Sequence, residues 1–187
     1  HITAEGDSVR MAYTVPSNLV AVGNGKLKSV KNLGNKTTYE WFVSNPINNY
    51  NISVQIGNYV AVQDTFLKDN ETHFMNHYVL DYNRELASNF FPQSKEVIRF
   101  YEKYFGDYQW YNDGYKLIEV PYLGMEHQSA VTYGNGFSMY NGVRSKSWPM
   151  YGVIDPLIIH ETGHEWFGNS VTASDPTHIW IHEGLQV

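Results

Sequence analysis

One ten-residue segment, HETGHEWFGN at residues 160–169, constrains the fold of this chain more than any other. It lies in a run that carries the signals of an α-helix. Asp155 suits the N-cap, Pro156 suits the first helical position, and Gly168 suits the residue just past the C-terminus. Because a helix turns about 100° per residue, His160 and His164 lie on one face, about one turn apart. The glutamate that follows the first histidine lies beside them.

Two histidines and a glutamate in this order are what zinc-dependent hydrolysis requires. Two neutral imidazoles bind the ion, and the neighbouring carboxylate, Glu161, accepts the proton of the attacking water. The alternative is a buried helix whose two histidines are only hydrogen-bonded. Burying them beside Ile158, Trp166 and Phe167 without a partner is costly, so the metal site is the preferred interpretation.

A third ligand is expected from another element, because catalytic zinc usually has three protein ligands and one open position. The segment HIWIHEGLQV at 178–187 predicts a second helix, and Glu183 lies in it. Eighteen residues (165–182) separate His164 from Glu183, which leaves room for a turn, a polar loop and a returning helix. The apolar members of this second helix are Ile179, Trp180, Ile181 and Leu185.

These motifs together resemble the aminopeptidase N-like gluzincins, a family of zinc metallopeptidases that also contains the leukotriene-A hydrolases. The matching features are HExxH, the eighteen-residue spacing, a glutamate within Trp-x-x-Glu-Gly, and the WFGN continuation at 166–169. The resemblance implies one Zn²⁺ per chain, bound by His160, His164 and Glu183, with Glu161 as the general base.

A second motif of the family is a Gly-x-Met-Glu-Asn strand, whose glutamate binds the free α-amino group of the substrate. In the stretch PYLGMEHQSAVTYG (121–134), Met125 and Glu126 match, and Gly124 matches a position that is usually small. Leu123 replaces a common glycine and His127 replaces the usual Asn, which leaves the fine specificity open. Alone, Glu126 would be an ordinary strand glutamate; beside a zinc site, its carboxylate would pair with the substrate ammonium.

Strand-forming segments fill the first part of the chain. Residues 9–15, 18–23, 37–43, 51–66 and 72–80 are rich in Val, Tyr, Thr and Phe and are separated by turn signals. The segment 84–106 has helical apolar spacing, with Pro92 dividing or starting a helix and Gly106 ending it. Residues 116–122 and the segment around Met125 predict two further strands.

The composition shift near residue 80 predicts a domain boundary. By the resemblance, residues 1–80 are the C-terminal part of an N-terminal all-β domain, and residues 81–187 are the N-terminal part of a thermolysin-like α+β catalytic domain. The expected fold class is therefore mixed α/β, in a chain that we expect to be a fragment of a longer protein. The resemblance also implies an oxyanion-stabilising tyrosine, which would lie beyond Val187.

Composition excludes several classes of protein. With 42% hydrophobic and 16% aromatic residues, the 187-residue chain is folded rather than disordered. A net charge of −6 without a basic run argues against a nucleic-acid partner. No apolar run is long enough for a transmembrane helix, and no signal peptide is visible, so we expect a soluble chain of undetermined compartment. The absence of cysteine excludes disulfides and thiolate ligands.

Two other histidine pairs have the same spacing of four residues. His73 and His77 lie on one face of a predicted strand without an acidic partner, so we assign them to the surface or to packing. His178 and His182 form a rival metal pair on the second helix. Since His182 is adjacent to Glu183, it points about 100° away from it. We therefore expect His182 to lie behind the ligands rather than among them.

The resulting hypothesis is a zinc-dependent aminopeptidase that removes N-terminal residues from peptides with a free N-terminus. Two alternatives stay open. One is another zinc hydrolase on the same site, either an endopeptidase or an epoxide hydrolase, and Glu126 argues against a plain endopeptidase. The other is a non-catalytic scaffold for protein binding, which would need neither the metal ligands nor Glu161.

Overall fold

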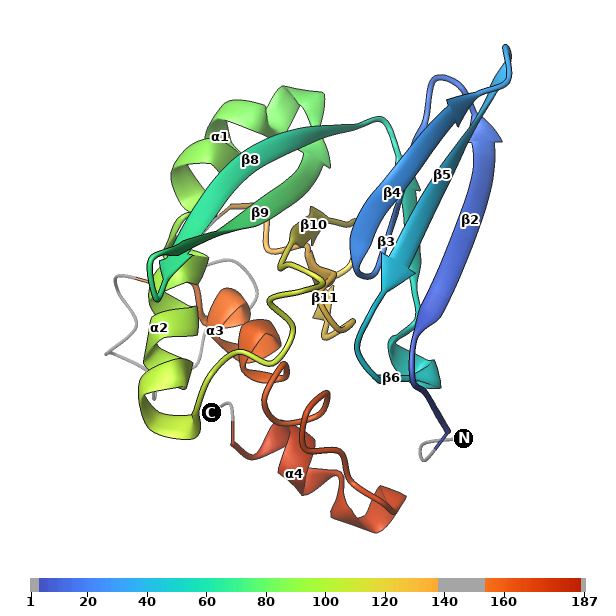
Figure 1. Ribbon diagram of the computed structural model, residues 1–187. Coiled ribbons are helices and arrows are strands. Elements are labelled where there is room, and N and C mark those ends of the chain that lie inside the picture. The colour runs from blue at the N-terminus through green and yellow to red at the C-terminus, as the bar shows by residue number, and fades with distance from the viewer. Residues whose placement is uncertain (1–3, 138–153, 186–187) are drawn as a thin grey trace.

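The computed structural model describes residues 4–137 and 154–185. Antiparallel strands form the N-terminal part of the molecule, and a five-stranded sheet with helices forms the rest (Figure 1). This arrangement confirms the expected fold class, in which an all-β portion precedes a portion of strands and helices.

The N-terminal strands form three small antiparallel sheets. One has the order β2 (Val9–Pro16), β5 (Lys36–Val43), β4 (Lys26–Asn32); the others pair β3 (Val20–Gly23) with β7 (Val54–Gly57), and β1 (Glu5–Gly6) with β6 (Ile47–Asn48). Side chains alternate between the two faces of a strand, so Met11 and Val15 of β2 and Trp41 and Val43 of β5 are all buried. The 3₁₀ turn η1 (Asn49–Asn51) follows β6.

The larger sheet contains both parallel and antiparallel pairs. Its order is β11 (Gly124–Met125), β12 (Val131–Tyr133), β10 (Leu117–Glu119), β9 (Glu71–Leu80), β8 (Tyr59–Lys68). The central strand β10 runs parallel to β12 and to β9, whereas β11–β12 and β8–β9 are antiparallel. This sheet is where the strand of the predicted amine-binding motif lies.

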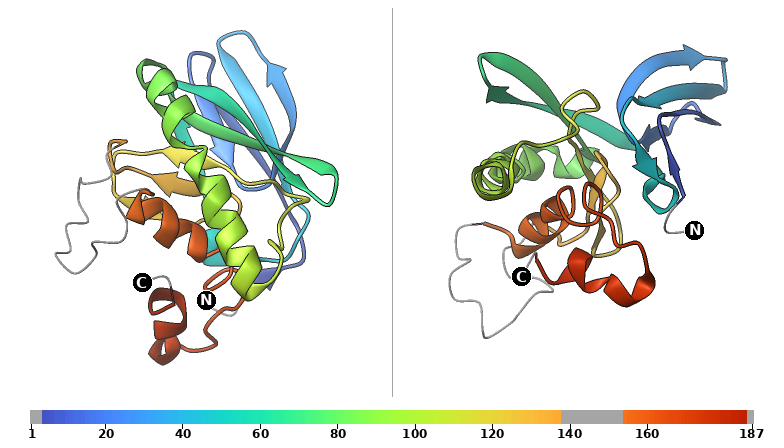
Figure 2. Two further views of the ribbon diagram at one scale, coloured as in Figure 1. Left: turned by 90° about the vertical axis from the view of Figure 1, so that its left-hand side faces the viewer. Right: turned by 60° about the horizontal axis from the view of Figure 1, so that its bottom comes forward.

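Each face of this sheet is covered by a different part of the chain. Neighbouring residues alternate between two buried clusters: Val79 and Leu117 pack in a core with the helices, whereas Tyr78 and Ile118 pack in a core with the N-terminal strands. The strand period of two residues explains this division. The sheet is thus held between the helices on one side and the N-terminal strands on the other (Figures 1 and 2).

The first helical segment, predicted over residues 84–106, is divided and ends where the sequence indicated. After η2 (Asp81–Asn83), α1 (Arg84–Phe90) and α2 (Gln93–Phe105) are separated at Pro92, and α2 ends at Gly106, which has φ of 95°. The remaining helical segments are α3 (Pro156–Gly163), the 3₁₀ turn η3 (Pro176–His178) and α4 (Trp180–Glu183).

Two predicted helices are shorter than expected. Regular α3 ends at Gly163, and the chain continues through turns to Gly168, which has the expected positive φ of 132°. The predicted helix 178–187 is reduced to the four residues of α4, and residues 186–187 lie outside the described residues. The 3₁₀ turn η3 occupies the start of this segment, and its α-helical hydrogen bonds run from the N–H groups of Glu183 and Gly184 to the carbonyl oxygens of Ile179 and Trp180.

The composition shift near residue 80 falls inside the five-stranded sheet. Strand β9 pairs with β10 through Tyr78 and Ile118, and β9 pairs with β8 along its whole length. The strand-rich stretch from 59 to 80 therefore shares hydrogen bonds with the strands that follow it, and composition alone does not reveal this long-range pairing.

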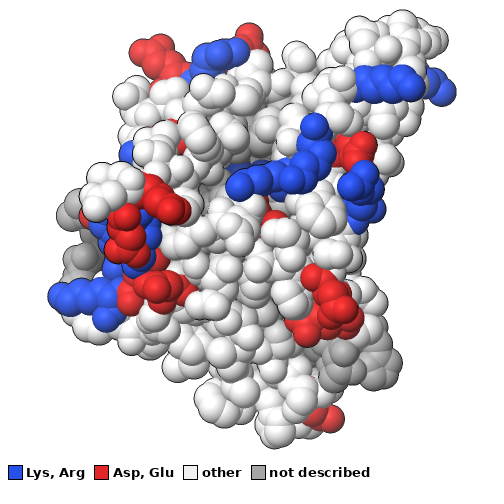
Figure 3. All heavy atoms as spheres, in the orientation of Figure 1, with Lys and Arg blue, Asp and Glu red and all other residues white. Residues whose placement is uncertain are grey.

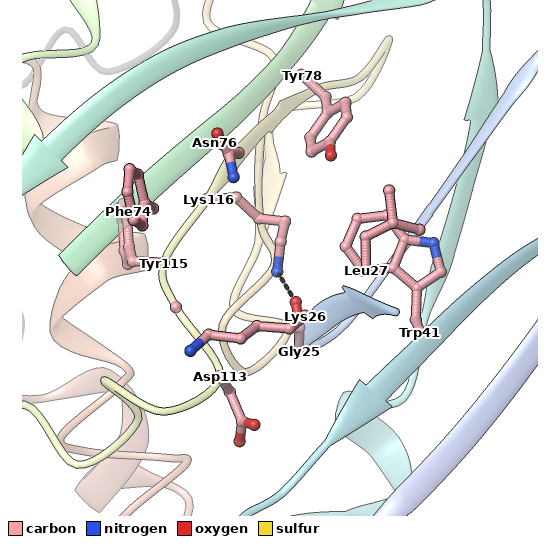
Figure 4. Close-up of a pocket in the computed structure, with 11 residues that line it drawn as sticks. Gly25, Lys26, Leu27, Trp41, Phe74, Asn76, Tyr78, Asp113, Tyr115 and Lys116 are labelled. Atoms are coloured by element: carbon pink, nitrogen blue, oxygen red, sulfur yellow. Dashed lines mark hydrogen bonds between the residues drawn. The ribbon is translucent and has the colours of Figure 1, made fainter. Parts of the chain in front are cut away.

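A buried lysine joins the N-terminal strands to the larger sheet beside a cavity of about 220 Å³ (Figure 4). The Nζ of Lys116 donates hydrogen bonds of 2.7 Å to the carbonyl oxygens of Gly25 and Ser129, and lies 5.4 Å from the centre of the Trp41 ring. Burial lowers the pKa of Lys116 to about 7. These contacts satisfy the ammonium group and connect two distant segments of the chain.

The surface shows no continuous basic area on the face seen in Figure 3, where acidic and basic side chains are interspersed. In residues 4–137 and 154–185, no helix is long and apolar enough to cross a membrane.

Candidate metal centre and active site

Helix α3 begins at the buried N-cap residue Asp155, whose carboxylate accepts several hydrogen bonds. The carboxylate of Asp155 accepts a 2.8 Å hydrogen bond from the N–H of Leu157, as the sequence predicts for an N-cap. The same carboxylate accepts a 2.7 Å bond from the hydroxyl of Tyr133 on β12 and bonds of 3.1 Å from the amide of Asn135. The first turn of α3 is therefore attached to the sheet through Tyr133 of β12.

The two histidines of HExxH and the glutamate of α4 lie together. His160 Nε2 and His164 Nε2 are 3.2 Å apart, and Glu183 Oε2 lies 3.5 Å from the first and 3.8 Å from the second. Atoms bound tetrahedrally at about 2.1 Å from one ion lie about 3.4 Å from each other. The three atoms therefore fit around a single Zn²⁺.

The protonation of the two histidines also suits a metal. The Nδ1 of His164 lies 3.0 Å from the carbonyl oxygen of Phe167, which can only accept, so Nδ1 carries the hydrogen and Nε2 offers its lone pair. Burial lowers the pKa of both His160 and His164, and the neighbouring His164 lowers the pKa of His160 further. Neutral imidazole is the form that binds metal.

The histidine beside Glu183 anchors α4. His182 is buried, its Nε2 accepts a 2.9 Å hydrogen bond from the N–H of Ala173, and its ring stacks on Tyr50 at 6.2 Å between centroids. Among the described residues, neither His182 nor His178 belongs to a cluster that could hold a metal ion. These contacts engage the ring of His182 with Ala173 and Tyr50, and its place outside the ligand set stays a prediction.

Glu161 is a buried carboxylate close to the predicted amine-binding strand. Burial, together with the negative charges of Glu126 and Glu183, raises the pKa of Glu161 to about 8. A Cβ atom at Gly124 would lie 2.6 Å from Glu161 Oε1 and 3.0 Å from its Cδ. A side chain at position 124 would therefore displace the carboxylate of Glu161 from its place.

Glu126 follows directly after β11 and lies near the same group of charges. Burial raises the pKa of Glu126, and the negative charge of Glu183 raises it further, while His182 and His160 lower it. Carboxylate and imidazole atoms of Glu126, Glu161 and His164 lie within 4.8 Å of one another. Met125 pairs with Thr132 on β12, so the strand that carries Glu126 is attached to the sheet.

His164 Nε2 cannot serve two metal clusters at once. The same histidine belongs both to the group with His160 and Glu183 and to the group with Glu126 and Glu161. The first group has two imidazoles and one carboxylate, which are the ligands that Zn²⁺ prefers, whereas the second has two carboxylates of raised pKa. We therefore favour the first group as the metal site.

The two departures from the family motif have different surroundings. Leu123 is half exposed. The imidazole of His127 lies at the backbone carbonyl of Asn51 in η1, and burial lowers the pKa of His127 to about 4. His127 therefore points toward the N-terminal strands, where it takes part in packing the two parts of the molecule together.

Glu165, whose role the sequence left undecided, is a buried acceptor for three donors. The N–H of Ser129 donates to it at 2.8 Å, the amide of Asn169 at 3.1 Å and the hydroxyl of Tyr108 at 3.4 Å. Burial raises the pKa of Glu165 to about 7, and these hydrogen bonds oppose the shift. Asn169 lies in the WFGN segment, but only the fold brings it near the predicted amine-binding strand.

The histidines of β9 take part in packing, as the sequence indicated. His77 is completely buried, and its Nδ1 accepts a 2.9 Å hydrogen bond from the N–H of Leu117. Burial lowers the pKa of His77 to about 4. The ring of His73 lies 4.2 Å from that of Tyr111, measured between centroids.

Two imidazoles and a glutamate beside a buried carboxylate, on a mixed sheet backed by helices, are typical of zinc peptidases. The Peptidase family M1 domain matches residues 89–187, more than half of the chain, and the chain belongs to this family. The match confirms the resemblance seen in the sequence motifs.

The chain is also similar to named members of the family. It is 24% identical over 179 residues to Aminopeptidase M1-D of Oryza sativa subsp. japonica, covering 94% of this chain and 20% of that protein. It is 26% identical over 176 residues to Glutamyl aminopeptidase of Rattus norvegicus, covering 91% of this chain and 18% of that protein. The chain thus spans about a fifth of the length of these relatives.

A solved structure has the same fold. The crystal structure of the M1 zinc metallopeptidase from Deinococcus radiodurans superimposes with a TM-score of 0.76 at 18% sequence identity. The alignment covers 96% of this chain and 38% of that structure. The described fold is therefore the fold of the corresponding part of that metallopeptidase.

Proposed function

We propose that this chain carries the metal-binding part of a zinc-dependent aminopeptidase. The observation that supports this most is the convergence of three ligand atoms, with Glu183 Oε2 3.5 Å and 3.8 Å from the two histidine Nε2 atoms. His160, His164 and Glu183 would hold one Zn²⁺ per chain. Bound there, zinc would polarise the scissile carbonyl and lower the pKa of water.

Glu161 is proposed as the general base. Its carboxylate would accept a proton from the attacking water and pass it to the leaving amine. Burial and two neighbouring carboxylates give Glu161 a pKa of about 8, which a nearby cation would lower. Gly124 leaves the space in which this carboxylate is held.

Glu126 is proposed to bind the ammonium group of the substrate, at the strand formed by Gly124 and Met125. A free N-terminus is the one charge that all substrates of an exopeptidase share. Because Glu126 is largely buried and has a raised pKa, a cationic partner would stabilise its ionised form. Peptides with a free N-terminus are therefore the proposed substrates.

The alternatives differ in how they use Glu126. An endopeptidase has no need for an ammonium-binding carboxylate beside the metal, and an epoxide hydrolase of the leukotriene type would act on a different class of substrate. A non-catalytic scaffold would need neither the buried base Glu161 nor the glycine that accommodates it. The geometry around Glu161 and Gly124 thus favours a catalytic site.

We also propose a two-domain organisation with an earlier boundary than composition indicated. The pairing of β9 with β10 supports a catalytic domain that begins near β8, at about residue 59, instead of near residue 81. The preceding strands would then be the C-terminal part of an all-β domain.

The proposed function is tested with the full-length protein on a panel of aminoacyl anilides and their N-acetylated counterparts. We expect cleavage of the free-amine set alone, loss of cleavage with a chelator, and recovery on addition of zinc. The variant Glu126→Ala should raise KM for free amines about ten- to a hundred-fold, because a charged hydrogen bond contributes about 1.5–3 kcal/mol. Equal cleavage of both sets would point to an endopeptidase, and cleavage of neither would favour the scaffold.

A further inference from the structure

The side chain of Asn169 meets three separate parts of the molecule. Its Nδ2 donates to the backbone carbonyl of Glu126 at 3.0 Å and to Glu165 Oε2 at 3.1 Å. Its Oδ1 accepts from Asn51 Nδ2 at 2.7 Å and from the Tyr50 hydroxyl at 3.4 Å. Asn169 is buried, so none of these partners can exchange freely for water.

Only one orientation of this amide satisfies its neighbours. A backbone carbonyl and a carboxylate accept hydrogen bonds, so the NH₂ group must face Glu126 and Glu165; the NH₂ of Asn51 donates, so the oxygen must face it. The backbone N–H of Asn169 also donates to the carbonyl of His164 at 2.9 Å. One residue therefore ties the segment after α3 to the amine-binding strand and to η1.

We infer that Asn169 is a positioning residue that sets the distance between Glu126 and the metal-binding helix, and thereby the preference for a free substrate N-terminus. The inference rests on the proposed function. Glu126 reaches the substrate from a backbone whose carbonyl Asn169 holds, while the main chain of Asn169 is bonded to the ligand His164. The side chain of Asn169 is hydrogen-bonded to protein groups, and it would act on the substrate through Glu126.

The test compares full-length wild type with Asn169→Ala and with the isosteric Asn169→Asp, which replaces two donors by an acceptor. We expect the ratio of kcat/KM for free-amine over N-acetylated anilides to fall about ten-fold or more, mainly through KM, because small displacements of binding groups have effects of up to about 10²-fold. Zinc content should stay the same. In the Glu126→Ala background, Asn169→Ala should change the ratio no further.

Two additional variants separate positioning from stability. Asn51→Ala removes a donor to Asn169 without touching Glu126 or a metal ligand, so it should lower the same ratio to a smaller extent. Asn135→Ala removes another buried amide, at the cap of α3, and should lower the melting temperature without changing the ratio. Binding of unblocked and acetylated peptides in the Glu161→Gln background provides a readout that does not need turnover.

Two results would overturn the inference. One is an unchanged ratio in Asn169→Ala and Asn51→Ala while wild type prefers free amines, which would leave the proposed function standing. The other is an equal fall in the ratio with and without Glu126, which would show that Asn169 does not act through that residue. A wild type that binds blocked and free peptides equally would overturn the proposed function itself, and this inference with it.

Discussion

Helices α3 and α4 both supply proposed metal ligands, but they are held very differently. Helix α3 starts at a buried cap, packs against α2 and β12, and leaves the side chain of His164 only 1% exposed. Helix α4 has four residues, and the side chain of Glu183 is 56% exposed. His182 of α4 connects this helix to the rest of the molecule through its contacts with Ala173 and Tyr50. In the proposed metal site, α3 would therefore be the pre-organised part, and α4 would complete the ligand set.

The largest expected effect is a loss of zinc binding when one proposed ligand is removed, either the one that follows α3 or the one on α4. His164→Ala should abolish turnover and weaken zinc binding by about a hundred-fold or more, since a zinc-binding free energy of about 10–16 kcal/mol would be shared among only three protein ligands. Glu183→Ala should weaken it less, because water can replace an exposed carboxylate. Competition with a zinc-selective chelator measures both. Equal losses of zinc affinity in the two variants would contradict the inferred difference between α3 and α4.

The next effect concerns Glu161, the proposed base, which lies on α3 beside the proposed ligands. Glu161→Gln should lower kcat by about 10²–10⁴-fold, the range expected for general acid–base catalysis, because the amide cannot accept the proton. Zinc content should remain at the wild-type level. Steady-state kinetics with metal analysis checks both, and normal turnover would remove Glu161 from the proposed role.

Gly124 on strand β11 tests the placement of the Glu161 carboxylate on α3. Gly124→Ala should lower kcat by about 10²-fold, because its Cβ would lie 2.6 Å from Glu161 Oε1 and displace the carboxylate. Gly6→Ala is the matched control, since its Cβ would meet nothing closer than 3.7 Å. A Gly124→Ala enzyme with the activity of this control would contradict the assigned contact.

The smallest expected effect tests how α4 is anchored. His182→Ala removes the acceptor for the N–H of Ala173 and the ring that stacks on Tyr50, so Glu183 should lose its fixed position. Zinc affinity should fall about ten-fold, as for other residues that support ligands. His178→Ala, an exposed histidine four residues earlier, is the control. Identical zinc affinities in the two variants would show that α4 needs no such anchor.

The same contrast explains what the sequence could predict. The spacing of His160 and His164 and the cap at Asp155 are local, so helical geometry alone brings the two imidazoles together. Glu183 and Glu126 were identified by resemblance, because no local rule shows that an eighteen-residue loop or a distant strand returns to the same point.

Long-range contacts explain what the sequence did not reveal. The pairing of β9 with β10, which places residues 59–80 in the later sheet, depends on segments about forty residues apart. The four hydrogen bonds of Asn169 likewise join residues up to 119 positions apart. Polar residues such as Asn169 have no periodic pattern, so their burial becomes visible only in the folded molecule.

The most direct test of the central claim is anomalous diffraction at the zinc absorption edge from crystals of the full-length protein. Our account predicts one peak per chain, bounded by His160 Nε2, His164 Nε2 and a carboxylate oxygen of Glu183. A peak among Glu126, Glu161 and His164 would assign the metal to the competing cluster and remove Glu161 as the base. The absence of any peak from zinc-supplemented crystals would contradict the zinc centre altogether.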